Sequence, residues 1–258
     1  MLMLFGIFVA YICIRLCKSK AMKIIYLGSI VSGCLLLYAT NSRANYIGFL
    51  MGAAFILFMQ LKKQRVFVKV VLSFICVLTV LITLPIIIET FQKLLSLIAL
   101  DIDINSLNSG GVRVNLILNG VLFLFQTAGF GVGAGNIEHW MATRSAFPTR
   151  EITNIHNWWA EIFAAYGVAI FAFYIIFYSG LFMNFYKRYR FSKSRDERVI
   201  SLGLMGILVG FIVGSMSASS NISEEWLWVF FAIMIAFQGY KSEFTIEEVN
   251  DYLAKISE

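Results

Sequence analysis

The sequence has 258 residues, of which 59% are hydrophobic and only 14% are charged, and its mean hydropathy is +0.79. Soluble globular domains carry about 45–50% apolar and about 25% charged residues, so the composition excludes a soluble domain with one apolar anchor. The net charge of +6 does not indicate a nucleic-acid-binding protein. The basic residues form short clusters between apolar runs, which is typical of membrane topology.

The apolar runs predict an all-α protein, a polytopic bundle of about seven transmembrane helices. Each crossing needs about 20 apolar residues. In chain order, the predicted spans are residues 2–16, 22–40, 45–61, 66–88, 158–183, 199–217 and 226–240. We therefore expect one transmembrane domain, residues 1–240, and a polar tail, residues 241–258, that forms a short amphipathic helix.

The distribution of basic residues predicts the orientation of these spans. Lys and Arg are frequent after the first, third and fifth spans and scarce in the alternate loops. Because short cytoplasmic loops collect Lys and Arg, we expect the N-terminus outside the cytoplasm and the C-terminal tail inside.

Residues 89–157 form a predicted large extracytoplasmic loop. Its apolar stretch, residues 112–125, carries Arg113, Asn115 and Asn119 in its first half. Counting this stretch as an eighth span would also place the basic cluster that follows residue 183 outside, against the charge rule. We expect instead short helices in the loop, one of which lies at or dips into the outer membrane surface.

Three polar features lie on the predicted outer side. Arg43 stands at an outer helix end, where it could bind a ligand or could equally be a snorkelling arginine. Arg113 follows two glycines and begins the apolar stretch, where a guanidinium suits either a diphosphate or lipid head groups. His156 lies at a membrane boundary and could accept a proton near neutral pH, although a lone histidine is more often structural.

The residues around His156 add further polar groups. Asn157 follows it directly, and Glu161 lies about one turn into the next span, where it could pair with an arginine or hold His156 in one tautomer. We expect Trp158 and Trp159 to belong to the aromatic belt at the membrane boundary.

The glycine run GFGVGAGN, residues 129–136, does not predict a nucleotide site. It lacks a preceding strand and the Lys-Ser/Thr pair of a P-loop. We interpret it as a flexible hinge that lets the backbone approach a ligand. The cysteines show no metal-ligand or disulfide spacing and are expected to be small buried hydrophobic residues; they are Cys13, Cys17, Cys34 and Cys76.

The order of these motifs carries a resemblance. An SR motif opens a helix in NSRANYIGF (41–49), Arg113 opens the helix of the outer loop, and GFGVGAGN precedes IHNWWAEIFAAYG (155–167). Over roughly residues 40–180 this resembles the O-antigen ligase and polymerase superfamily. Its members transfer or polymerise undecaprenyl-diphosphate-linked glycans outside the cytoplasmic membrane.

The resemblance implies a glycan ligase or polymerase of the bacterial inner membrane, working in capsule, O-antigen or teichuronic-acid biosynthesis without a metal or other cofactor. Its partners would be a lipid-linked oligosaccharide donor and a glycan or lipid acceptor. Arg43 and Arg113 would bind the donor diphosphate, and His156 would act as general base or position the acceptor. Asn157 and Glu161 would belong to the same substrate site.

Two points stay open in the sequence. Members of the superfamily usually have ten or more spans. The seven spans found here therefore predict that this chain is a shortened member or the C-terminal portion of one. The alternative functions are a transporter or flippase for a polyprenyl-linked glycan, which would need polar residues along a path through the bundle, and a scaffold for other enzymes. The clustering of polar residues on the outer side favours interfacial chemistry over transport.

Overall fold

The computed structural model describes residues 1–40, 42–61, 109–216 and 224–239. All secondary structure in these ranges is helical, which confirms the all-α prediction for them. In chain order the helices are α1 (Leu2–Leu16), α2 (Lys20–Ala39), α3 (Arg43–Gln60), α5 (Ser109–Gln126), α6 (Ile137–Arg144), α7 (Trp158–Phe191), α8 (Arg195–Gly214) and α9 (Glu225–Gly239).

Six of the seven predicted spans coincide with a helix, namely α1, α2, α3, α7, α8 and α9. The predicted span 66–88, the start of the predicted loop and the predicted tail helix lie outside the described residues. Three helices, α2, α7 and α8, are long and apolar enough to cross a membrane. The described residues therefore support three crossings by length and composition, and the figure of about seven stays a prediction.

The chain divides into two compact units. The first unit comprises Met1–Gln60, Tyr174–Ser217 and Asn221–Glu258, and the second comprises Leu61–Phe173 and Ala218–Ser220. The first unit contains α1, α2, α3, α8, α9 and the C-terminal half of α7. The second unit contains α5, α6 and the N-terminal half of α7.

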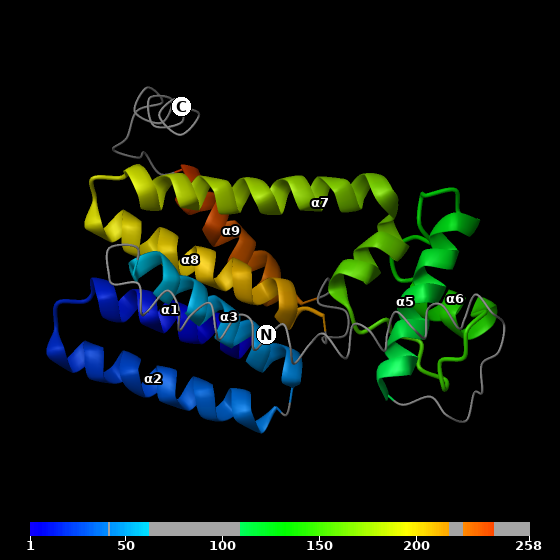
Figure 1. The fold of residues 1–258 in the computed structure, drawn as a ribbon, viewed down its shortest axis with the longest axis horizontal. Coiled ribbons are helices and arrows are strands. Elements are labelled where there is room, and N and C mark those ends of the chain that lie inside the picture. Colours follow the sequence, from blue (N-terminus) through cyan, green and yellow to red (C-terminus); the bar gives the residue numbers. More distant parts are fainter. Residues whose placement is uncertain (41, 62–108, 217–223, 240–258) are drawn as a thin grey trace. The chain divides into compact units, whose positions relative to one another are not determined.

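In the first unit, α8 is the central helix. It packs against α3 and α1, and α1 in turn packs against α2 (Figure 1). In the most apolar 18-residue stretch of each helix, 72% of the α8 residues are buried by protein, compared with only 11% of the α2 residues. Apolar side chains on α2 such as Ile24 and Leu35 are 70% and 65% exposed. Because α2 is apolar and yet unburied, its outer face suits hydrocarbon.

Glycines let α3 and α8 approach each other at backbone distance. A Cβ added at Gly48 would lie 2.5 Å from the carbonyl oxygen of Gly210, and one at Gly52 would lie 2.5 Å from that of Gly206. On both helices these glycines recur every four residues and so share one face. Small residues at this spacing are a common basis of helix packing in membranes.

A buried ion pair joins α7, α8 and α9 in the first unit. The Nη1 atom of Arg188 lies 2.5 Å from the Oε1 atom of Glu197, and its Nη2 atom donates to the Gln238 carbonyl at 2.6 Å. Asn184 accepts from the guanidinium Nε at 3.0 Å, and the Ser192 hydroxyl donates to Glu197. Arg188 stands in the basic cluster that follows residue 183, and α7 continues to Phe191 and turns this arginine inward. The cytoplasmic location of the cluster stays a prediction.

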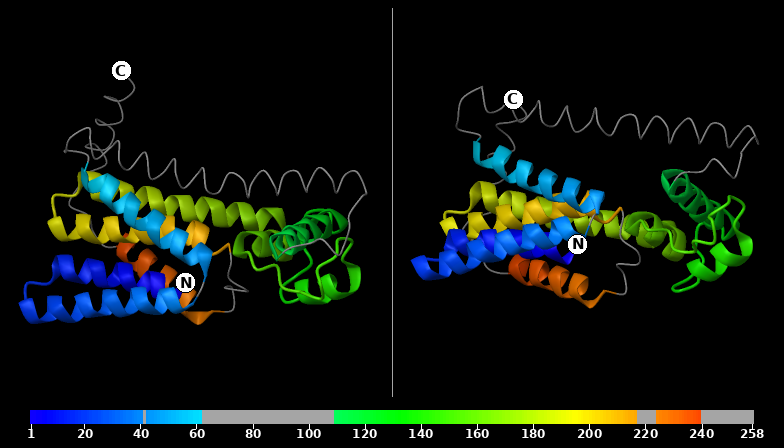
Figure 2. Two further views of the ribbon diagram at one scale, coloured as in Figure 1. Left: turned by 60° about the horizontal axis from the view of Figure 1, so that its bottom comes forward. Right: turned by 90° about the horizontal axis from the view of Figure 1, so that it is seen from below.

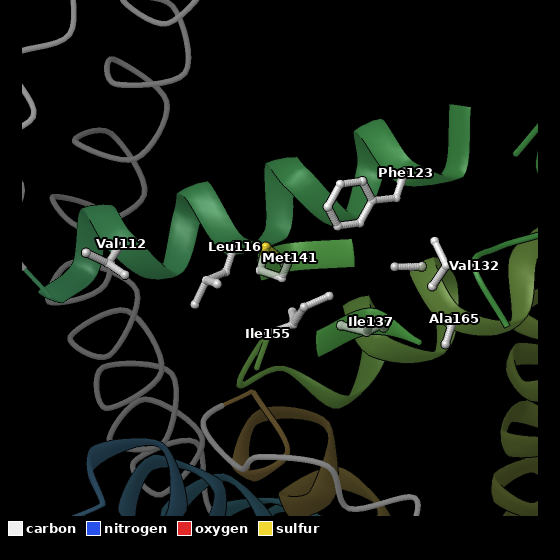
Figure 3. Packing of buried hydrophobic residues seen from close by; sticks show 9 residues of the cluster. Val112, Leu116, Phe123, Val132, Ile137, Met141, Ile155 and Ala165 are labelled. Atoms are coloured by element: carbon white, nitrogen blue, oxygen red, sulfur yellow. The ribbon is translucent and has the colours of Figure 1, made fainter. Parts of the chain in front are cut away.

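The second unit has its own apolar core. Val112, Leu116 and Phe123 lie on one face of α5 and point towards Met141 of α6 and Ile155 of the following loop (Figure 3). Both views of Figure 2 show α5 and α6 next to each other. One face of α5 is thus covered by protein, so the prediction of a surface helix holds at most for its opposite face.

Of the predicted buried cysteines, Cys13, Cys17 and Cys34 are free thiols and only half-buried. They lie on α1 and α2 or just after α1, where the helices are incompletely covered by protein. Cys76 lies outside the described residues.

Candidate functional site

Two buried asparagines on α5 hold the loop that leads towards His156. The Asn115 amide donates to the Pro148 carbonyl at 2.8 Å. The Asn119 amide donates to the Phe147 carbonyl at 2.9 Å, and its oxygen accepts from the backbone N–H groups of Ala146 and Phe147 at 2.9 and 3.0 Å. Both side chains are almost fully buried, so their polar atoms need these partners. In the sequence, these asparagines indicate only that the apolar stretch is not a membrane span.

The hydrogen bonds of Asn119 yield a stability prediction. Replacing Asn119 by leucine removes three hydrogen bonds to part-buried backbone groups, each worth about 0.5–1.5 kcal/mol. We expect the segment between Arg144 and Arg150, both exposed, to detach from α5. Limited trypsin digestion should then cleave at these arginines faster than in the unaltered protein.

The matched control is Thr143→Ala, because the exposed Thr143 hydroxyl donates to a carbonyl within its own helix. It should leave the digestion rate unchanged. Equal cleavage of the Asn119→Leu and unaltered proteins would show that Asn119 does not hold the loop.

His156 is held in an unusual backbone conformation. Its φ is +52°, in the left-handed region that residues other than glycine seldom adopt. Its backbone N–H donates to the Asn154 side-chain oxygen at 2.9 Å. Such conformations persist only where the surroundings enforce them, and they cluster at functional sites. Arg150 and Glu151, in the same loop, also have positive φ values.

Arg113 and His156 influence each other electrostatically. Burial and the positive charge of Arg113 lower the pKa of His156 below its ordinary value of 6.5. Arg113 is exposed and His156 is half-buried. The charge of Arg113 thus acts on the His156 ring, and the meeting of the two side chains in one substrate site stays a prediction.

The other residues after His156 have structural roles in α7. The Asn157 side-chain oxygen accepts from the backbone N–H groups of Trp159 and Ala160, at 3.1 and 3.2 Å, and so caps the helix. Glu161 lies in the first turn, where a carboxylate is favoured by the helix dipole. Trp158 is fully buried. The aromatic-belt prediction is therefore wrong for Trp158, because the start of α7 packs into the second unit.

The glycine run binds the backbone of α7 at an interruption in that helix. Helix α7 has a non-helical residue at Gly167, with φ +83° and ψ 177°. Three backbone hydrogen bonds join the run to this interruption: Val132 N–H to Ala164 O at 3.0 Å, Gly133 N–H to Ala165 O at 2.8 Å, and Val168 N–H to Gly129 O at 3.0 Å. The glycine run thus supplies hydrogen-bond partners for backbone groups of α7 around the interruption.

Glycine is required at this junction on both sides. A Cβ at Gly131 would lie 2.5 Å from the Ala165 carbonyl oxygen, and one at Gly167 would lie 2.4 Å from the Gly129 carbonyl oxygen. Both glycines also have positive φ values. The interpretation of the run as a flexible hinge is therefore wrong for residues 129–133, whereas the approach of its backbone to a ligand stays a prediction. Its close backbone approach is to α7.

Arg43 is exposed and is the first residue of α3. It belongs to the first unit, whereas Arg113 and His156 belong to the second. The convergence of all three residues on one cavity stays a prediction. Among the residues that the structure describes, no group of three or more His, Cys, Asp or Glu side chains is arranged to hold a metal.

These motifs have a counterpart in a known family. The sequence profile described as "O-Antigen ligase" matches residues 27–175. The chain belongs to this family. The match contains all five predicted site residues, which are Arg43, Arg113, His156, Asn157 and Glu161. The resemblance inferred from the motifs is therefore confirmed.

The chain is also similar to the teichuronic acid biosynthesis protein TuaE of Bacillus subtilis (strain 168). The two are 31% identical over 214 residues, which cover 81% of this chain and 44% of that protein. The chain thus spans less than half the length of this relative. No solved structure matches the chain. The family and the apolar helices together make this a multi-pass inner-membrane protein of cell-surface polysaccharide biosynthesis.

Proposed function

We propose that this O-antigen ligase family member transfers a glycan from a polyprenyl-diphosphate donor to an acceptor hydroxyl at the outer face of the membrane. The single observation that carries the proposal is the pairing of Arg113 with His156 in the second unit, where burial and the charge of Arg113 lower the pKa of the histidine. A fixed cation and a neutral base are the two groups that this transfer needs.

The proposed step is a displacement at the anomeric carbon of the donor sugar. The acceptor oxygen forms a bond to that carbon, and the bond from the carbon to the diphosphate oxygen breaks. The neutral imidazole of His156 takes the acceptor proton, so a pKa below 6.5 suits the role at pH 7. Arg113 binds the diphosphate, whose negative charge increases as it leaves.

The surroundings of the pair support this assignment. The Asn154 bond and the α7 cap made by Asn157 hold the backbone on either side of the His156 ring. Positioning of this kind is a major part of the catalytic effect when two substrates must react. In the proposal Glu161 lies in the substrate site, one turn into α7.

The test is restoration of surface glycan in a bacterial host that lacks its own ligase or polymerase, at matched membrane expression. We expect Arg113→Ala to lower transfer by about 10²–10³-fold, as for loss of a transition-state donor. We expect His156→Ala to lower it by about 10²–10⁴-fold. Arg150→Ala and His139→Ala are the matched controls, because both residues are exposed in the second unit.

The proposed enzymatic function is supported if the unaltered protein and both controls restore surface glycan and the Arg113→Ala and His156→Ala proteins do not. If the Arg113 and His156 variants restored as much glycan as the controls, the site assignment would be wrong. A flippase or scaffold role, which needs neither side chain, would then be favoured.

The electrostatic pairing can be measured without substrate. The chain has two histidines, His139 and His156, so the ring signals of isotope-labelled histidine can be assigned with a His139→Gln variant. In an NMR titration we expect His156 to gain its proton below pH 6.5. Removing the positive charge with Arg113→Gln should raise the pKa of His156 towards the ordinary value, because a nearby cation disfavours the protonated ring.

The titration follows His139 and His156 separately, and only His156 is expected to respond to the change at Arg113. His139 is exposed on α6 and serves as the internal reference in both proteins. An unchanged His156 titration in the Arg113→Gln protein would contradict the pairing.

A further inference from the structure

Two large aromatic side chains of the second unit are left uncovered by protein. Phe125, near the end of α5, is 77% exposed, and Phe130, in the glycine run, is 82% exposed. Burying an aromatic side chain of this size is worth about 1.5–3 kcal/mol. Uncovered aromatic residues close together in the chain therefore indicate an apolar partner.

Backbone contacts place Phe130 beside the start of the apolar part of α7. The preceding residue, Gly129, accepts a hydrogen bond from the Val168 N–H at 3.0 Å. A Cβ at Gly129 would lie 3.7 Å from the Val168 side chain. Val168 begins a series of exposed apolar residues on α7, which includes Ile170 and Phe173. All these residues belong to the second unit.

We name Phe125, Phe130 and Val168 the apolar patch. Val168 belongs to a helix long and apolar enough to cross a membrane, with only 22% of its most apolar window buried. A helix of this kind exposes apolar side chains to hydrocarbon when it spans a bilayer. The patch extends this apolar surface onto the glycine run and the end of α5.

We propose that bilayer hydrocarbon covers the apolar patch, so that α5 enters the membrane obliquely by its C-terminal end. Arg113 lies 12 residues before Phe125 in the sequence, which at about 1.5 Å per residue is about 18 Å along the helix. This separation allows the aromatic end to lie among acyl chains while Arg113 remains at the aqueous side. The exposed Glu138 and His139 of α6 remain in water in the same arrangement.

The inference concerns the placement of the second unit and does not rest on the proposed function. The sequence predicts that residues 112–125 lie near the outer membrane surface, but it does not predict which end enters the membrane. The glycine run then has a second consequence. By bonding to α7 it fixes Phe130 at the level where the apolar part of α7 begins.

The test is site-directed spin labelling of the full chain in vesicles of phosphatidylethanolamine and phosphatidylglycerol. The four cysteines are first replaced by serine, and single cysteines are then introduced by Phe130→Cys, by Phe125→Cys and, as the aqueous control, by Glu138→Cys. Collision of the nitroxide with oxygen reports hydrocarbon, and collision with a water-soluble nickel chelate reports water.

We expect the oxygen effect to exceed the nickel effect at positions 125 and 130, and the reverse at 138. Nickel access at 125 and 130 equal to that at 138 would overturn the proposal. Low access of both reagents at 125 and 130 would show that protein, such as a second copy of the chain, covers the patch, and would also overturn it. Measuring two patch positions protects the test against a single variant that does not fold.

Discussion

Replacing Gly48 by alanine is expected to destabilise the first unit, although alanine is the better helix former. The new methyl carbon would lie 2.5 Å from the Gly210 carbonyl oxygen and 3.0 Å from the Gly214 backbone nitrogen. Both atoms are backbone of α8, which cannot move aside as a flexible side chain can. Overpacking of this kind costs about 1–3 kcal/mol, and we expect a lower midpoint of thermal unfolding in detergent.

The matched control is Gly28→Ala on α2. A Cβ at Gly28 meets nothing within 4 Å. Glycine within a helix costs about 1 kcal/mol relative to alanine, so this variant should be neutral or slightly more stable. The same glycine-to-alanine change is thus expected to lower the stability of the protein at position 48 and to leave it equal or slightly higher at position 28. A Gly48→Ala protein as stable as the Gly28→Ala protein would show that α3 and α8 do not pack at backbone distance.

The second large effect is expected at the buried ion pair. Replacing Arg188 by methionine leaves the Glu197 carboxylate buried without its guanidinium partner, and it removes the donor to the Gln238 carbonyl. Losing one partner of a buried pair costs about 3–5 kcal/mol. We expect the Arg188→Met protein to unfold at a clearly lower temperature and to accumulate poorly in membranes. Lys187→Met, an exposed neighbour, should have little effect.

A double variant separates charge from shape at this site. Replacing a buried ion pair by apolar residues of similar volume is often neutral or stabilising. The protein with Arg188→Met and Glu197→Met should therefore recover most of the stability that Arg188→Met loses. If the double variant were as unstable as the single one, the cost would lie in lost packing or in the other hydrogen bonds of Arg188, and not in an uncompensated carboxylate.

The helices and the family were predictable from local properties of the chain. Each apolar run extends over several helical turns, so composition alone located α1, α2, α3, α8 and α9 within about four residues and the start of α7, which continues eight residues beyond its predicted end. The motifs around Arg113, the glycine run and His156 were sufficient for the family, since short motifs in a fixed order identify it without three-dimensional coordinates.

Other assignments required contacts between residues far apart in the sequence. The sequence analysis treated the glycine run as flexible, because glycine by itself indicates only conformational freedom. The positive φ values at Gly131 and Gly167 and the hydrogen bonds to α7 show a fixed junction. The four-residue spacing of Gly48 with Gly52, and of Gly206 with Gly210, was a signal in the sequence that could have predicted helix packing.

The sequence by itself determined the helical class, the order of the helices and the family, because each depends on hydrophobicity over one segment or on a short local motif. Only the tertiary structure decided what each polar residue contacts. Arg188 stands in a basic cluster in the sequence and yet is buried against Glu197. Asn119 stands in an apolar stretch and yet holds a loop 27 residues away. The reason is physical: a polar group in a low-dielectric interior is stable only with a partner, and that partner is chosen by the fold.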